Sequence, residues 1–155
     1  MDTSTLLDEF VSAILSRDGE RFAKLFAPDG TYDDVFYGVH RGREDIAHMV
    51  NDRFYETADD FRWDMVNPVR QGDMIYSRVI FSYVSSLPGA MKPRVLMESV
   101  SMMRLKDGLI QEYTEVVNNG PSLVECGLPP EHVAKILNRQ GQKLRNKPEA
   151  QRHLA

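Results

Sequence analysis

The sequence predicts an α+β fold in which helices come first and a run of long antiparallel strands follows. Up to about Glu56, apolar residues recur mainly at the three- and four-residue spacing of amphipathic helices. After Asp60 the residues become rich in β-branched and aromatic side chains, and turn signals divide them into strands. Helices followed by consecutive strands indicate an α+β protein rather than a parallel doubly wound sheet.

Two helices are expected near the N-terminus. The first covers residues 6–16, where Ser4 or Thr5 can act as the N-cap. The second begins at Gly19 and ends in the turn-forming residues 28–30, Pro-Asp-Gly. A helical hairpin therefore precedes the first strand.

A short strand at residues 31–36 and a third helix at residues 43–51, with a continuation toward residue 56, complete the first part. The later strands are expected at residues 61–66, 74–85, 95–105 and 109–117. They are divided by breaks at residues 68–73, 87–93 and 106–108. In the last break Asp107-Gly108 suits the positive φ angles of a tight hairpin.

A last helix is expected at residues 129–144, so we divide the chain into a domain at residues 1–128 and a helical extension at residues 129–155. The segment 131–155 has a net charge of +4, whereas the remainder has −8. Its basic residues lack the interleaved aromatic side chains of a nucleic-acid stacking surface. We therefore interpret them as a solvated helix face, with no nucleic-acid partner.

The compartment and the redox state follow from simple counts. At 155 residues the chain fits one ordinary domain, and its longest apolar runs are too short to span a membrane. Acidic residues stand where a signal peptide needs basic ones, which predicts a cytoplasmic protein with no membrane partner. Cys126 is the single cysteine, so neither an internal disulfide nor a cysteine-cluster metal site is expected.

The order helix, helix, strand, helix and then a curved sheet resembles the nuclear transport factor 2-like superfamily over about residues 5–118. This superfamily includes ketosteroid isomerases, limonene epoxide hydrolases, scytalone dehydratases and SnoaL-like polyketide cyclases. The resemblance implies a cone-shaped antiparallel sheet with N-terminal helices that enclose an apolar pocket. It also implies a hydrophobic small-molecule ligand and no cofactor or metal. A homodimer through the outer face of the sheet is implied as well, with Met97, Val100 and Met102 as apolar residues near it.

Residues 6–34 are similar to the N-terminus of ketosteroid isomerases without a gap. This similarity places Asp34 at the position of the general base, a carboxylate that gains basicity in a partly dry site. Two hydrogen-bond donors of those enzymes are replaced. The tyrosine position is Phe10, and the protonated aspartic acid falls near Ser99 or Ser101.

These replacements argue against a strict ketosteroid isomerase, unless a tyrosine supplies the missing donor from another wall. The candidates are Tyr32, Tyr55 and Tyr76.

Residues 108–115 are similar to the closing strand of SnoaL-like cyclases and epoxide hydrolases, where an acid stands at the position of Glu115. Strand alternation puts Tyr113, Glu115 and Val117 on one face. If that face borders the pocket, Asp34 and Glu115 form a two-carboxylate site in which mutual repulsion raises one pKa. Such a pair suits isomerisation, dehydration or aldol-type cyclisation.

Two other family mechanisms match less well. The epoxide hydrolase pattern is met in part by Tyr32 with Asp34 and by Arg78, but its aspartate position is Ile80. Scytalone dehydratases need a pair of pocket histidines. The histidines here lie in expected helix, loop or tail segments: His40, His48, His132 and His153.

Each candidate also has an ordinary interpretation. Asp34 can serve as a turn residue, Glu115 as an exposed strand residue, Arg78 as a surface ion-pair partner, and His40 as a loop residue near the pocket rim. Several large side chains belong either to the core or to the pocket wall: Tyr32, Trp63, Met65, Tyr76 and Met103.

The leading hypothesis is a cofactor-independent enzyme that moves protons on a hydrophobic substrate, as an isomerase, dehydratase or cyclase. Asp34, Glu115 and Tyr32 are its candidate catalytic residues. The candidate substrate-binding residues are Phe10, His40, Trp63, Tyr76, Arg78, Ser99, Ser101 and Met103. The alternatives are a non-catalytic ligand-binding or dimeric assembly module and, third, an epoxide hydrolase-like hydrolase.

Overall fold

The α+β fold class is confirmed in the computed structural model, which describes residues 1–90 and 94–155. The N-terminal helical elements are α1 (Thr3–Leu15), α2 (Gly19–Ala23), α3 (Gly42–Asn51) and the short 3₁₀ helix η1 (Arg53–Tyr55). The strands are β1 (Phe26–Asp34), β2 (Gly38–Arg41), β3 (Ala58–Gln71), β4 (Met74–Ser85), β5 (Arg94–Lys106) and β6 (Leu109–Asn118). The end of the expected break at residues 87–93 lies outside the described residues.

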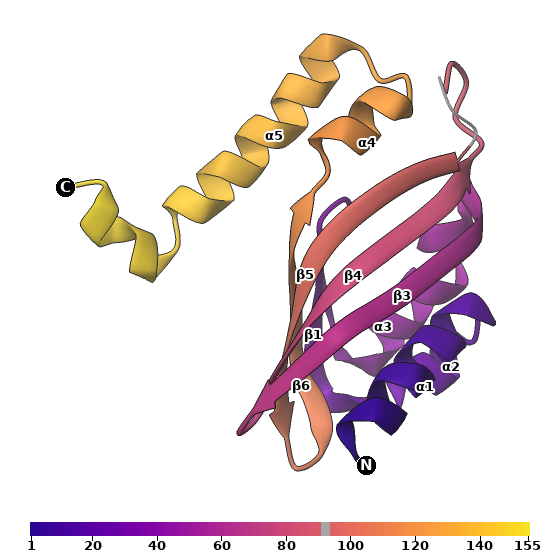
Figure 1. Ribbon diagram of the computed structural model, residues 1–155, viewed down its shortest axis with the longest axis vertical. Helices are drawn as coiled ribbons and strands as arrows, with labels where there is room; N and C mark the ends of the chain where they lie inside the picture. Colours follow the sequence, from indigo (N-terminus) through magenta and orange to yellow (C-terminus); the bar gives the residue numbers. More distant parts are fainter. Residues whose placement is uncertain (91–93) are drawn as a thin grey trace.

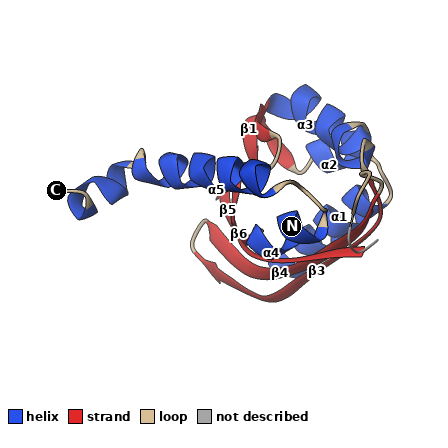
Figure 2. Ribbon diagram, turned by 90° about the horizontal axis from the view of Figure 1, so that it is seen from above, coloured by secondary structure: helices blue, strands red, loops and turns tan. Residues whose placement is uncertain are grey.

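The described strands form one curved sheet in the order β2-β1-β6-β5-β4-β3. Seen from above, the strands bend around α1, and α2 and α3 lie on the opposite side of the enclosed space (Figure 2). The sheet is mixed rather than wholly antiparallel, because β1 runs parallel to β6. Parallel neighbours need a long connection, and α3 with strands β2 to β5 lies between β1 and β6 in the chain.

The core is an aromatic cluster between α1 and the concave face of the sheet. Phe10 on α1 has no exposed surface and packs against the rings of Phe22, Trp63 and Tyr113. The N-cap of α1 is Asp2, whose carboxylate accepts a hydrogen bond from the Thr5 amide at 3.0 Å. The expected cap at Ser4 or Thr5 is therefore wrong by two or three residues, since both lie inside the helix.

Strand β1 begins five residues earlier than expected, and the Pro-Asp-Gly segment 28–30 lies inside it rather than in a turn. The register with β6 shifts between Phe26 and Thr31, so the proline lies in an irregular part of the ladder. A side chain at Gly30 would come within 2.9 Å of the Ile110 carbonyl oxygen. Glycine here allows a close strand approach rather than a turn.

Strand β3 is also longer than expected and continues through Pro68 to Gln71. A register shift lies between Val66 and Val69, and Asn67 has a φ of 51°. Because β3 is an edge strand, a proline at a bulge removes no essential ladder bond. The hairpin at Asp107-Gly108 is confirmed, with φ angles of 52° and 79°.

The C-terminal segment contains α4 (Gly120–Glu125), α5 (Pro130–Arg145) and the 3₁₀ helix η2 (Pro148–His153). Helix α4 was not expected from the sequence, whereas α5 lies within one residue of the expected helix at each end. Helix α5 extends away from the sheet (Figure 1), and none of its residues is buried. Lys143 forms an ion pair with Asp33 near the end of β1. None of the described helices is long and apolar enough to cross a membrane.

Candidate active site

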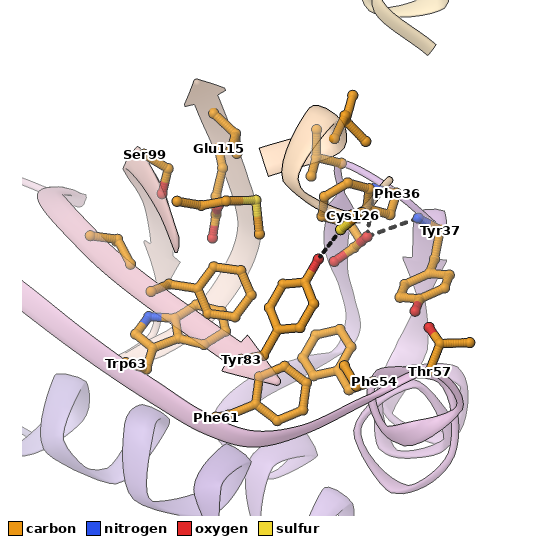
Figure 3. A pocket seen from close by; sticks show the side chains of 18 of the residues that line it. Phe36, Tyr37, Phe54, Thr57, Phe61, Trp63, Tyr83, Ser99, Glu115 and Cys126 are labelled. Atoms are coloured by element: carbon orange, nitrogen blue, oxygen red, sulfur yellow. Dashed lines mark hydrogen bonds between the residues drawn. The ribbon is translucent and has the colours of Figure 1, made fainter. Parts of the chain in front are cut away.

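A cavity of about 190 Å³ lies between the concave face of the sheet, the turn after β1 and the segment that joins α4 to α5. A space of this size admits an organic molecule rather than a single water. Eight aromatic side chains contribute to its wall: Tyr32, Phe36, Tyr37, Phe54, Phe61, Trp63, Phe81 and Tyr83. Figure 3 shows Phe54, Phe61 and Trp63 along one side and Glu115 and Ser99 along another.

Asp34 is the last residue of β1 and lines this pocket. Its Oδ1 accepts hydrogen bonds from the amides of Phe36 at 2.7 Å and Tyr37 at 2.8 Å (Figure 3). The side chain therefore holds the turn that carries two pocket residues, as the turn interpretation expects. One oxygen serves this turn, so the two roles are compatible.

Glu115 lines the same pocket from β6. The alternation expected from the sequence is observed, since Tyr113 is buried while Glu112 and Val116 are exposed. Glu115 lies opposite Ser101 on β5 and accepts a hydrogen bond from the Tyr113 hydroxyl. The pocket thus holds two carboxylates from two neighbouring strands.

Tyr32 and Tyr113 lie on these two strands, opposite each other in the parallel ladder. Their rings stack with centroids 4.4 Å apart. Tyr113 thus contacts Tyr32 through its ring and donates its hydroxyl proton to Glu115. Burial, followed by the negative charge of Glu115, raises the pKa of both phenols. Both therefore remain protonated donors at neutral pH.

The two carboxyl groups differ in acidity. Burial raises the pKa of Glu115 to about 7, with the Tyr113 hydrogen bond opposing the increase and the charge of Asp34 adding to it. Burial also raises the pKa of Asp34, but the amides of Tyr37 and Phe36 oppose that increase. Amide donors favour the charged form of Asp34, whereas Glu115 is poised to gain or lose a proton near neutrality.

Two of the expected substrate-binding residues, Trp63 and Ser99, also line the pocket. Trp63 is 7% exposed and is held on the inner face of β3. Ser99 faces inward from β5, and its hydroxyl is in hydrogen-bonding reach of Glu115. With Asp34, Glu115 and Tyr32, five expected site residues are brought together.

Two expectations are wrong because of strand alternation. Arg78 and Tyr76 lie on the outer face of β4, where their exposed fractions are above 40%. The Arg78 guanidinium is paired at 2.6 Å with Glu98 of the neighbouring strand. Ser77 and Val79, between and beside them, are the residues that face inward.

Three more expected residues are buried but do not line the pocket. Phe10 and Met103 are fully enclosed core residues. The Ser101 hydroxyl donates to the Ser77 carbonyl oxygen at 3.3 Å, deeper along the sheet. These side chains support the pocket wall from behind and do not reach the cavity.

His40 is placed differently from the loop that the sequence suggested. It lies on strand β2, opposite Tyr32, and its Nδ1 is 3.1 Å from the Asp45 carboxylate. It does not line the pocket, but a positive charge on it would lower the pKa of Asp34. The expectation of a histidine at the pocket rim is therefore wrong, and His40 supports β1 from the edge of the sheet.

Several residues in or behind the pocket wall were not expected from the sequence. Tyr113 was assigned only to a strand face, yet from behind the wall its ring stacks on Tyr32 and its hydroxyl donates to Glu115. The Tyr83 hydroxyl contacts Cys126 Sγ at 3.5 Å (Figure 3), and Cys126 comes from the unexpected helix cap after α4. Alternation along β4 places Phe81 and Tyr83 on one face, but only the fold reveals that α4 closes over them.

The C-terminal extension takes part in the wall, because Ile136 lines the cavity next to Leu128, the last residue of the domain. Beyond them, α5 stands over a second groove of about 580 Å³ that borders the turn after β1 and the outer side of β6. Ile136 is the residue by which α5 reaches the cavity wall. Leu137 and Leu144 keep 40% and 60% of their surface exposed.

Comparisons with known proteins agree with this geometry. The model of the SnoaL-like domain matches residues 7–113, which is more than half of the chain. Comparison with curated proteins finds no match. Within residues 1–90 and 94–155, no three His, Cys, Asp or Glu side chains are placed to bind one metal ion together.

Solved structures share the fold at low sequence identity. A protein with a ketosteroid isomerase-like fold from Catenulispora acidiphila, crystallised with trimethylamine, is 21% identical with a TM-score of 0.73, covering 84% of this chain and 98% of that one. IdmH, a proposed polyketide cyclase from Streptomyces antibioticus, is 22% identical with a TM-score of 0.64, covering 83% and 100%.

An epoxide hydrolase of the limonene epoxide hydrolase-like type from Mycobacterium tuberculosis is 16% identical with a TM-score of 0.62, covering 86% of this chain and 94% of that one. These identities are too low to transfer an activity, but the shared fold and the family match agree. The chain belongs to the SnoaL-like domain family.

Proposed function

We propose that the protein is a cofactor-independent enzyme that transfers protons on a hydrophobic carbonyl-bearing small molecule. The observation that supports this most directly is that Asp34 and Glu115 line one aromatic pocket. A pKa of about 7 at Glu115 makes it an efficient proton donor or acceptor at neutral pH. Two carboxylates with different environments permit a division into base and acid.

In the proposed reaction Asp34 removes a proton from the carbon next to the substrate carbonyl. The electron pair of the broken C–H bond moves toward the carbonyl oxygen and gives an enolate. In a substrate with a C=C bond next to that carbon, the enolate is conjugated, and return of the proton at its far end with a shift of the double bond completes an isomerisation. Attack of the enolate on a second carbonyl instead completes an aldol-type cyclisation. Glu115, while protonated, supplies the proton that a departing or newly formed oxygen requires.

The Tyr113 hydroxyl orients the acid, and the ring of Tyr32 stacks on that of Tyr113. Because Tyr113 donates to Glu115, it limits the rise in the pKa of that carboxyl and fixes its position. Tyr32 is 2% exposed and reaches the pocket wall. We assign it a supporting role through Tyr113.

The hydrolase alternative is less well supported. Arg78 lies on the outer face, paired with Glu98, and Ile80 occupies the position where the hydrolase pattern needs an aspartate. No relay from these residues reaches a water in the pocket. The SnoaL-like family match and the fold shared with a proposed polyketide cyclase favour carbon-acid chemistry instead.

Proton exchange tests this proposal without knowledge of the natural substrate. The probe is 2-tetralone, an enolisable ketone on an aromatic skeleton, incubated with the protein in D₂O while NMR follows loss of its α-protons. Exchange should exceed the buffer rate and fall at least tenfold in Asp34→Asn and Glu115→Gln, as general acid–base groups typically contribute ~10² or more. Arg78→Ala is the control and should keep the full rate. Equal exchange in all four samples would argue for a binding module.

We also propose that two copies associate through the outer face of the sheet. Val100 and Val116 are direct cross-strand neighbours there and are 45% and 65% exposed, with Leu96 59% exposed beside them. Exposed apolar residues gathered on one face are typical of an interface. Of the three residues suggested from the sequence, Met97 is excluded because it faces the pocket. Light scattering should show a dimer that Val116→Lys converts to monomer, and a monomeric wild type would exclude it.

A further inference from the structure

The groove beneath α5 adjoins the main pocket at the two carboxylates. It has a volume of about 580 Å³. Asp34 and Glu115 line both the groove and the pocket. The other residues that line both spaces are Val35, Phe36, Tyr37 and Val117. A molecule bound beside the two carboxylates can therefore continue into the groove.

The two spaces differ in charge. No lysine, arginine or histidine is among the described residues that line the pocket. The groove, in contrast, is lined by Arg139, Lys143 and Lys147. Arg139 and Lys143 lie one turn apart on α5, and Lys147 follows the C-cap of that helix. Positive charge thus lies along the side of the groove that the C-terminal extension provides.

Two of these three cations have no acidic partner. Lys143 Nζ lies 2.6 Å from Asp33 Oδ1, and this pair ties α5 to β1. Among residues 1–90 and 94–155, the side chains of Arg139 and Lys147 form neither an ion pair nor a hydrogen bond. An anion placed between them would gain two attractive charges without breaking an existing pair.

The middle of the groove has room for an apolar chain. Gly141 lines it from the interior of α5, where glycine is a poor helix former. A Cβ added there would meet no atom within 4 Å beyond its chain neighbours and its own helical backbone. Leu137 and Leu144, one turn to either side, also line the groove. The groove therefore offers apolar contact as well as positive charge.

We propose that this groove binds the anionic end of the substrate, a carboxylate or a phosphate, at Arg139 and Lys147, while the carbonyl end lies in the pocket. The inference rests on the proposed function for the carbonyl end. Charge orients the molecule, because Asp34 repels an anion from the pocket and the cations beside α5 attract it. The substrate is then an elongated keto acid or keto phosphate.

Three ketones of one skeleton test the assignment by calorimetry on the full-length protein. They are 4-(2-naphthyl)-4-oxobutanoate, its methyl ester, and the analogue with a terminal phosphate. Both anions should bind about tenfold more tightly than the ester, the gain expected from two exposed ion pairs. This advantage should shrink as salt is added. The anion that binds more tightly identifies the end group, whereas equal affinities for all three would overturn the proposal.

Arg139→Gln combined with Lys147→Gln removes both unpaired charges. This double variant should lose the preference for the anions and bind the ester as the wild type does. Lys135→Gln is the matched control, because Lys135 is exposed on the same helix and lines neither space. A double variant that keeps the preference contradicts the proposal. So does a control that loses it, since the attraction would then come from the charge of the whole segment.

Gly141→Leu tests occupation of the groove separately from its charge. The leucine side chain would fill the open space, so affinity for the keto acid should fall severalfold. Affinity for 2-tetralone, which has no chain to place there, should stay at the wild-type value. Leucine also favours the helix more than glycine does, so α5 is retained. An unchanged affinity for the keto acid would show that its chain does not pass beneath α5.

The two proposals fail separately, because NMR in D₂O follows α-proton exchange in the same keto acid and its ester. Catalysed exchange in both, with equal affinities, removes the anion site and leaves the proton-transfer function intact. A preference for the anions without catalysed exchange retains the anion site and removes the catalytic proposal.

Discussion

The Tyr113 hydroxyl donates a hydrogen bond to Glu115, two residues further along the same face of β6. This bond favours the charged form of the carboxylate in a site where burial disfavours it. Strand alternation thus places Glu115 and Tyr113, which modulates its pKa, on the same face of β6. A single β6 residue sets how readily the next inward residue releases its proton.

Tyr113→Phe should therefore raise the pKa of Glu115 further. A hydrogen bond to a charged group is worth about 1.5–3 kcal/mol, which corresponds to a rise of roughly one to two pKa units. The measurement is the pH dependence of α-proton exchange, which should move to higher pH. Tyr76→Phe, which removes a hydroxyl from the outer face, should leave the profile unchanged. A profile that stays in place in Tyr113→Phe would show that the bond does not control the acidity.

Glu115→Gln should change how stability depends on pH. The pKa of Glu115 is raised from 4.5 to about 7, so the folded state binds this proton more tightly than the unfolded state. Wild-type stability is then lost as pH rises from about 4.5 to 7, whereas the neutral glutamine avoids that loss. At pH 8 the variant should be more stable by on the order of 3 kcal/mol at most, and near pH 4 the two should agree. Urea unfolding at both pH values decides this, and a variant less stable at pH 8 would contradict it.

Phe10→Ala should be strongly destabilising. Phe10 has no exposed surface and contacts several rings of the core, so its removal leaves a cavity that costs about 3–5 kcal/mol. Chemical denaturation measures this loss, and Phe10→Leu should recover a good part of it. A change below 1 kcal/mol would mean that the α1 face is not packed as described.

Arg78→Ala should affect the protein little. Its ion pair with Glu98 is more than half exposed on both sides, and such pairs contribute at most about 1 kcal/mol. Both the midpoint of thermal unfolding and the affinity for 2-tetralone should remain close to the wild type. A large loss of affinity would place Arg78 at the ligand after all.

Removal of residues 129–155 should lower the affinity for a ligand while the stability of the fold changes little. Helix α5 has no buried residue, so the midpoint of unfolding should change by only a few degrees. Ile136 lines the pocket, so affinity for 2-tetralone should decrease. Lys143→Ala, which removes only the ion pair with Asp33, is the matched control and should retain affinity. An unchanged affinity in the truncated chain would mean that α5 is not part of the ligand site.

Local signals predicted the fold where one residue type decides the backbone. Asp107-Gly108 fixed the last hairpin because both residues accept positive φ. The Pro-Asp-Gly segment misled the prediction, since the same residues also suit an irregular strand when a neighbouring strand approaches Gly30 closely. That approach is a tertiary contact, and nothing within the segment specifies it.

Strand alternation and family resemblance together predicted part of the site. Alternation placed Glu115 with Tyr113, and resemblance placed Asp34, but neither gives the absolute facing of a strand. Arg78 and Tyr76 were consequently assigned to the wrong side of β4.

The carboxylate of Asp34 combines the proposed role as a base with a structural role in the turn after β1. Its Oδ1 accepts hydrogen bonds from the amides of Phe36 and Tyr37, so the residue proposed as the base also holds the turn that forms this rim of the pocket. Asn can keep the rim while losing the base, whereas Ala loses both. A single Asp34→Asn substitution would thus remove the proposed base and leave the pocket intact. The product would be a protein that binds the same ligands without acting on them.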